Sequence, residues 1–227
     1  IKLLLALSST TKYIHDMLSQ SAESQMHALT NTLMVHAFDA PFNYGLADGQ
    51  LGMALVLHHY GHAYAVADAT EFADYLLDYV IVHVSDFSWL GFQTGLTGLG
   101  WGIEYLSQNQ FVCCDCADIC EEIDQIIKST DIRTLHRNGN AHVLQDVMRY
   151  LSVHFASLKG MARTSMKDYL WQQVDYMQKT PDCLNDANCQ SWMRGLAHLE
   201  DCNRNAPSLS PFVQVKNQPN GYGLRIG

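Results

Sequence analysis

One glycine pattern occurs twice in this chain and constrains its fold more than any other feature. The stretch GLADGQLGMALVLHHY begins at Gly45, and the stretch GFQTGLTGLGWGIEYL begins at Gly91, 46 residues later. Glycine costs roughly 0.5–1 kcal/mol relative to alanine inside a regular element, so such clusters indicate close backbone approach or positive φ angles. When the stretches are superposed, the glycines that coincide are Gly45, Gly49 and Gly52 with Gly91, Gly95 and Gly98. A repeat of this length is typical of stacked or toroidal helix hairpins.

Apolar residues at helical spacing extend this prediction to most of the chain. We expect helices at Lys2–Gln20, Ala22–His36, Gln50–Tyr60, Ala69–Val84, Ala117–Lys128, His142–Leu158, Ser165–Gln178 and Asp186–His198, and a further helix at the second glycine stretch. Asp115 is the expected N-cap of the helix that begins at Ala117. The fold class expected is all-α, an (α/α) toroid or partial toroid of helix hairpins in one domain over residues 1–227. Residues 203–227 are expected to be mostly loop, with Phe212–Val215 a short extended candidate.

Charge and hydropathy exclude several functions. The formal net charge is -9, and a nucleic-acid surface requires clustered Lys and Arg. The opening IKLLLALSSTT holds an apolar run of five residues, shorter than a secretory signal, and no stretch approaches the ~18 apolar residues of a membrane span. We therefore expect a cytoplasmic protein that binds neither nucleic acid nor membrane. The chain begins at Ile1 and ends in GYGLRIG, which resembles the start of another repeat, as in a fragment or shortened relative.

The glycine stretches have two interpretations. A phosphate-binding loop needs a glycine turn between a strand and a helix and a Gly-Lys-Ser/Thr ending, and neither stretch follows a predicted strand or has that ending. The interpretation favoured is structural: glycines at i, i+4 and i+7 allow inner helices to pack closely around a central axis.

With these motifs the chain resembles the lanthionine synthetase C-like family, whose members repeat G-[LF]-x-x-G-x-x-G at the start of each inner helix of an (α/α) toroid. The second copy, with the QNQFV stretch and the acidic helix after it, is similar to the Bacteroidetes-type variety of that family. The resemblance is clearest over residues 42–128. It implies a zinc site of two cysteines and one histidine, which activates a peptide cysteine to add to a dehydrated serine or threonine. The family's Cys-His dipeptide is missing from this chain.

The cysteine run CCDCADIC is the first alternative metal candidate. It supplies Cys113, Cys114, Cys116 and Cys120, with a Cys-x-x-Cys pair and an i, i+4 pair. A tetrahedral zinc site usually draws its second pair from elsewhere, where the chain offers Cys183, Cys189 and Cys202. The alternative is that these thiols are small buried apolar groups. Cys183 and Cys189 are close enough in sequence for a disulfide in an oxidising compartment, but free thiols are the simpler interpretation.

His58 and His62 in HHYGH lie one helical turn apart, a spacing that lets two imidazoles reach one cation. Because the helix is expected to end near Gly61, the favoured interpretation is that they are ordinary histidines at a helix C-terminus, where a protonated imidazole is favourable.

Glu104 is the candidate acid, because it lies one turn beyond the second glycine motif on a helix expected to line the centre of the toroid. It is either a functional acid or, as favoured, a buried partner for a neighbouring helix start. Asp48 occupies the corresponding loop of the first motif.

Three function classes follow from these patterns. The first is an enzyme, or former enzyme, of zinc-dependent peptide modification. The second is a noncatalytic scaffold that binds a peptide or protein. The third is a carbohydrate-active (α/α) toroid enzyme with paired carboxylates, for which Glu104 and Asp48 are the obvious pair.

Overall fold

The computed structural model describes residues 20–39, 43–87, 89–131, 134–135, 138, 140 and 142–201, and its regular elements within them are all helices. The predicted all-α class is therefore confirmed. Residues 20–36 are helical and precede α2 (Gln50–Tyr64), α3 (Ala67–Val82), the 3-10 turn η1 (Val84–Asp86), α4 (Leu96–Gln108), α5 (Cys116–Ile119), α6 (Glu121–Ser129), α8 (His142–His154), α9 (Gly160–Lys179), α10 (Pro181–Asn185) and α11 (Ala187–Asp201). Residues 2–19 of the helix predicted over Lys2–Gln20, Cys202 and the loop predicted over 203–227 lie outside the described residues.

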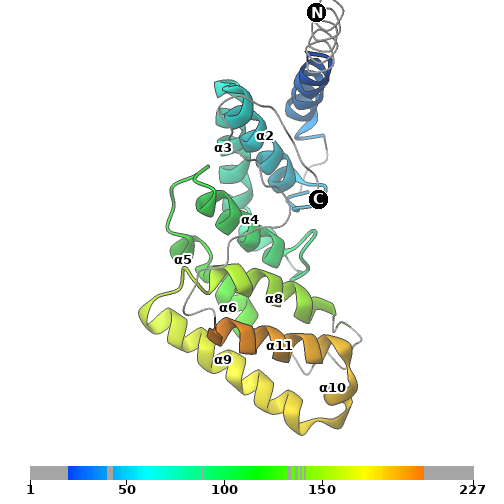
Figure 1. The fold of residues 1–227 in the computed structure, drawn as a ribbon, viewed down its shortest axis with the longest axis vertical. Coiled ribbons are helices and arrows are strands. Elements are labelled where there is room, and N and C mark those ends of the chain that lie inside the picture. Colours follow the sequence, from blue (N-terminus) through cyan, green and yellow to red (C-terminus); the bar gives the residue numbers. More distant parts are fainter. Residues whose placement is uncertain are drawn as a thin grey trace, which may run out of the picture.

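The helices form a stack that descends from α2 and α3 through α4 and α8 to α9 and α11 (Figure 1). Neighbouring contacts link α2 to α4, α4 to α8 and α8 to α11, while α3, α6 and α9 each pack against a member of that row. The helix 20–36 covers a small apolar cluster shared with α2 and α3, and a larger cluster fills the rest of the stack. Within the described part of the chain, no helix combines the length and the apolar character that crossing a membrane requires.

The two glycine motifs fold into the same local structure. Gly49 and Gly95 are the N-caps of α2 and α4, with φ and ψ of -114° and -171° in the first and -127° and -170° in the second. A hydrogen bond from the Gln50 amide to the Asn43 carbonyl is repeated 46 residues later by the bond from Leu96 to Trp89. The sequence repeat is therefore a repeat of one turn, which folds back over the first turn of the helix that it begins.

The motif glycines were expected to allow inner helices to pack closely, but the structure shows that some of them are required by the turn itself. A Cβ on Gly52 would collide with the carbonyl oxygen of Leu46, and one on Gly98 would collide with that of Phe92, so both glycines fit the backbone of their own turn. The two turns also touch, because the amides of Leu46 and Ala47 donate to the Gln93 carbonyl at 2.8 and 3.0 Å. Helix-to-helix contacts are made instead by later glycines of α4: Gly102 faces Leu51 on α2, and Gly100 faces Tyr150 on α8.

Several predicted helix boundaries were wrong. The first glycine helix does not end near Gly61 but continues to Tyr64, and Ala65 in the left-handed conformation ends it. Gly61 lies within the helix because it packs against Thr70 of α3, where a side chain on Gly61 would not fit. The predicted helix Ala117–Lys128 is two helices, α5 and α6, separated at Cys120. Asp115 caps α5 as predicted, its carboxylate accepting from the Ala117 amide at 3.1 Å.

The helices predicted in the C-terminal part of the chain are present, but their bounds differ from the predicted ones. Helix α8 ends at His154, before the predicted end, and α9 begins at Gly160, before the predicted start. The prediction for Asp186–His198 corresponds to α11, and it missed the short α10 ahead of it. Asp186 is the residue between these two helices, where its carboxylate accepts from the amides of Asn188 and Cys189.

Candidate functional site

A buried histidine between two carboxylates is the main polar feature of the core. His154 Nδ1 lies 2.7 Å from Glu104 Oε1, and His154 Nε2 lies 3.2 Å from Asp124 Oδ2. The Ser157 hydroxyl donates to Glu104 at 2.9 Å, and the Tyr150 hydroxyl donates to Asp124 at 2.9 Å. Glu104 and His154 are fully buried, and Asp124 is 5% exposed. These contacts join α4, α6 and α8 through one network of charged hydrogen bonds.

The network is built to hold a protonated imidazole. Burial by itself lowers the pKa of His154, but the hydrogen bonds to Asp124 and Glu104 outweigh it and raise that pKa to about 9. At neutral pH both ring nitrogens therefore donate, one to each carboxylate. The positive charge of the imidazolium offsets two buried negative charges, and the hydroxyl groups of Ser157 and Tyr150 satisfy the remaining carboxylate oxygens.

Sequence reasoning identified Glu104 and missed its partners. The expected partner was a helix start, and the structure places His154 there instead. The signal for the missed residues was a polar side chain within an apolar stripe. Asp124 lies between Ile123 and Ile127 on the buried face of α6, and His154 continues the buried face of α8 one turn after Leu151.

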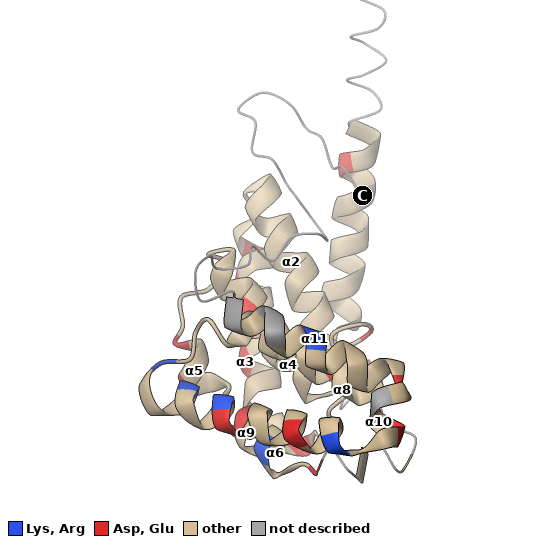
Figure 2. Ribbon diagram, turned by 60° about the horizontal axis from the view of Figure 1, so that its bottom comes forward, with Lys and Arg blue, Asp and Glu red and all other residues tan. Residues whose placement is uncertain are grey.

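Asp48 does not join Glu104. It is exposed in the turn before α2 and lines a shallow open groove of about 450 Å³, whereas Glu104 lies in the core. The groove is lined by Leu33, Leu46, Ala47, Asp48, Gly49, Gly52, Met53, Leu55 and Val56. Figure 2 shows that α2 carries no Lys, Arg, Asp or Glu, whereas charged residues gather on α9. The groove is thus apolar, with one carboxylate at its edge.

The cysteine run is divided between surface and core. Cys113 is exposed, Cys114 is half-buried, and Cys116 and Cys120 are buried at the two ends of α5. The Cys114 and Cys116 sulfurs are 3.7 Å apart. Burial raises the pKa of the Cys116 thiol to about 12 and also raises that of Cys120. Among the described residues, no group of three or more metal-ligating side chains is arranged to hold a metal ion.

The histidines of α2 surround an aromatic side chain. The rings of His58, His59 and His62 lie 5.8, 4.7 and 4.7 Å from that of Phe111. His58 is fully buried, so the expectation of an ordinary histidine at a helix end was wrong for this residue. Its Nε2 lies 3.5 Å from Asp74 without the alignment of a hydrogen bond, and burial lowers its pKa. His58 is therefore a neutral core side chain, whereas His62 is exposed.

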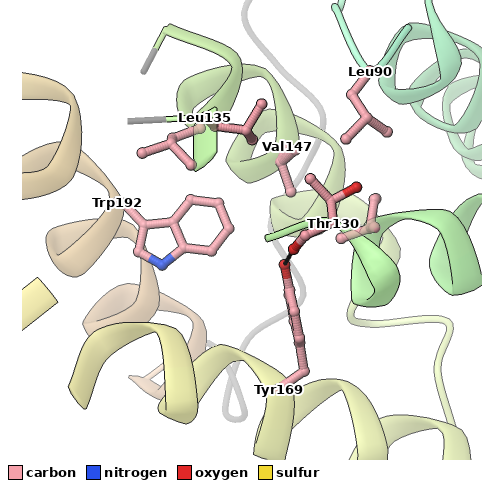
Figure 3. A pocket seen from close by; sticks show the side chains of 8 residues that line it. Leu90, Thr130, Leu135, Val147, Tyr169 and Trp192 are labelled. Carbon is pink, nitrogen blue, oxygen red and sulfur yellow. Dashed lines mark hydrogen bonds between the residues drawn. The ribbon is translucent and has the colours of Figure 1, made fainter. Parts of the chain in front are cut away.

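A second cavity in the described part of the chain is small and lined mainly by apolar side chains. Figure 3 shows Trp192, Tyr169 and Leu90 converging on it from α11, α9 and the segment before α4. Its volume of about 10 Å³ is the space of one water molecule at most. The Tyr169 hydroxyl donates to the Thr130 carbonyl at its edge. This cavity is a packing feature, so the groove beside α2 is the larger space open to a ligand.

Comparison with known proteins gives no family assignment. No family model matches the chain, and neither the curated proteins nor the solved structures include a match to it.

Proposed function

We propose that this chain is a lanthionine synthetase C-like helical repeat protein that binds a peptide in the groove beside α2. The support for the family is the motif itself, since the turn that it encodes recurs before α2 and α4 with the same capping angles and the same backbone hydrogen bond. In this proposal the hairpins belong to a toroid or partial toroid, and the glycine turns begin its inner helices.

The observation that carries the peptide-binding proposal is the composition of the groove. Leu33, Met53 and Val56 offer apolar side chains from two helices, and Asp48 is the one charged residue among those that line it. An occupant that matches these surfaces has apolar side chains and a positive charge, as does a peptide that combines leucine or valine with lysine or arginine. The net charge of -9 favours the approach of such a peptide.

The carboxylates favour binding over catalysis. An acid–base catalyst must reach the reacting atoms within hydrogen-bond distance. Glu104 and Asp124 are buried, paired with His154 and absent from the groove lining. A carbohydrate-active enzyme needs two acids that face one cavity, and Glu104 and Asp48 do not share one.

The test is a binding measurement with a matched pair of variants. A short fluorescein-labelled peptide that contains leucine and lysine is titrated with the protein and followed by fluorescence anisotropy. Val56 lines the groove and is 42% exposed, whereas Val82 is 76% exposed and lies away from it, so both positions accept Asp without loss of the core. We expect Val56→Asp to weaken binding at least tenfold and Val82→Asp to leave it unchanged. Equal binding by the two variants would refute the assignment of the groove.

A further inference from the structure

Two cysteines outside the peptide groove are arranged to react with one another. The Cys114 and Cys116 sulfurs are 3.7 Å apart, and Asp115 separates them in the chain. Asp115 has φ -88° and ψ 97° and holds the start of α5 through its bond to the Ala117 amide, so this segment has a defined conformation. A disulfide has an S–S length of about 2.05 Å, so its formation requires the sulfurs to approach by less than 2 Å.

The two thiols differ in their access to solvent, so that one of them can react first with a small molecule and the other can then react with the first. Cys114 is half-buried and can meet a small molecule from solvent, whereas Cys116 is 5% exposed and packs within the larger apolar cluster. Ser107 of α4 lies close to the Cys116 thiol. Cys183 and Cys189 form a contrasting pair, because their thiols also contact one another but both are fully buried.

We propose that Cys114 and Cys116 form a reversible disulfide when the protein meets a small-molecule disulfide such as oxidised glutathione. The Cys114 thiolate attacks one sulfur of the glutathione disulfide, which forms a mixed disulfide and releases one glutathione thiolate. The Cys116 thiolate then attacks the Cys114 sulfur, and the second glutathione thiolate leaves. Two protein thiols are oxidised, and one glutathione disulfide is reduced to two glutathione molecules.

The position of the pair makes this disulfide labile. Only one residue separates the two cysteines, and strained or exposed disulfides have more oxidising potentials than structural ones. The second step requires the Cys116 thiolate, and burial raises the pKa of this thiol to about 12. Ring closure is therefore slow at neutral pH, and its rate increases about tenfold for each unit by which the pH rises toward that pKa.

The test is peptide mapping of the native protein after exposure to oxidised glutathione. Remaining thiols are alkylated, and a protease that cuts before aspartate cleaves ahead of Asp115 and Asp118, which separates Cys114 from Cys116. We expect a disulfide-linked pair of these peptides in the wild type and in Cys113→Ser, its loss in Cys114→Ser, and accumulation of the glutathione mixed disulfide on Cys114 in Cys116→Ser. Excess reduced glutathione should restore the free thiols.

Three outcomes would overturn the proposal. The first is the absence of the linked peptides in the wild type at equilibrium with oxidised glutathione. The second is their loss in Cys113→Ser, which would place the disulfide on Cys113. The third is a link that persists in excess reduced glutathione, which would make it a structural bond. Because Cys113 is exposed, its variant tests the assignment without disturbing the core.

Discussion

Replacement of His154 by leucine tests the buried network most severely. The substitution removes the only cation of the network and leaves Glu104 and Asp124 as two carboxylates in the core. Breaking a buried ion pair by removing one partner typically costs about 3–5 kcal/mol, because the remaining charge is uncompensated. For a chain of this size, each kcal/mol lowers the melting temperature by roughly 2–4 °C. We therefore expect His154→Leu to melt at least ~6 °C below the wild type.

A triple variant that removes every charge of the network separates the effect of the unpaired charges on stability from the effect of altered packing. In the triple variant Glu104→Gln, Asp124→Asn, His154→Leu, no buried charge remains in the network, while Ser157 and Tyr150 keep polar partners. Exchange of a complete buried ion network for neutral groups is often nearly neutral, so this variant should recover most of the lost stability. The assay is urea denaturation at pH 7 for all three proteins. A single variant within ~0.5 kcal/mol of the wild type would refute the reasoning.

The same network predicts a pH dependence on the alkaline side. The pKa of His154 rises from 6.5 to about 9, and each pKa unit is worth 1.36 kcal/mol, so the charged form contributes about 3 kcal/mol. A base with a raised pKa in the folded state stabilises the protein fully below its unfolded pKa. That contribution is lost as the pH rises from about 6.5 through about 9. The free energy of unfolding should fall more steeply over this window in the wild type than in the triple variant. The fall that remains in the triple variant near pH 9 comes from buried thiols such as those of Cys116 and Cys120, whose pKa values are also raised.

Three further predictions follow from other sites. Gly98→Leu should destabilise the protein by typically 1–3 kcal/mol or more, because its side chain collides with the Phe92 carbonyl. Gly102→Ala is the milder control, because its Cβ meets the movable side chain of Leu51. Equal melting temperatures for Gly98→Leu and the wild type would contradict this. His58 has a lowered pKa, so its protonation opposes folding as the pH falls below about 6.5, and His58→Phe should show a smaller loss of stability between pH 7 and 5 in urea titrations. With zinc and a dehydrated cysteine-containing peptide, the chain should form thioether no faster than a zinc-free control, and an enhancement of even ~100-fold, about 2.7 kcal/mol of barrier, would contradict the noncatalytic proposal.

The helical class was predictable because its signals are local. Apolar spacing located most helices, and the glycine repeat predicted the turns before α2 and α4, which both begin directly after a motif glycine. The helix ends were less predictable. Gly61 was expected to end α2, but a tertiary contact with Thr70 holds it within the helix.

The buried network was only partly predictable because its members lie far apart in sequence. Glu104 and His154 are separated by 50 residues, and no local pattern shows that α4 and α8 are neighbours. Each residue alone is a polar side chain on an apolar face, which indicates a buried partner without naming it. The groove was unpredictable for the same reason, since its walls come from the helix 20–36 and from α2.

Hydrogen exchange of the protein with and without the leucine- and lysine-containing peptide tests the peptide-binding proposal most directly. If the peptide occupies the groove, amide exchange slows at residues 46–56 and on the facing side of the helix 20–36, while exchange in α9 and α11 is unchanged. Slowed exchange confined to α4 and the cysteine run, or no slowing at a saturating peptide concentration, would contradict peptide binding beside α2.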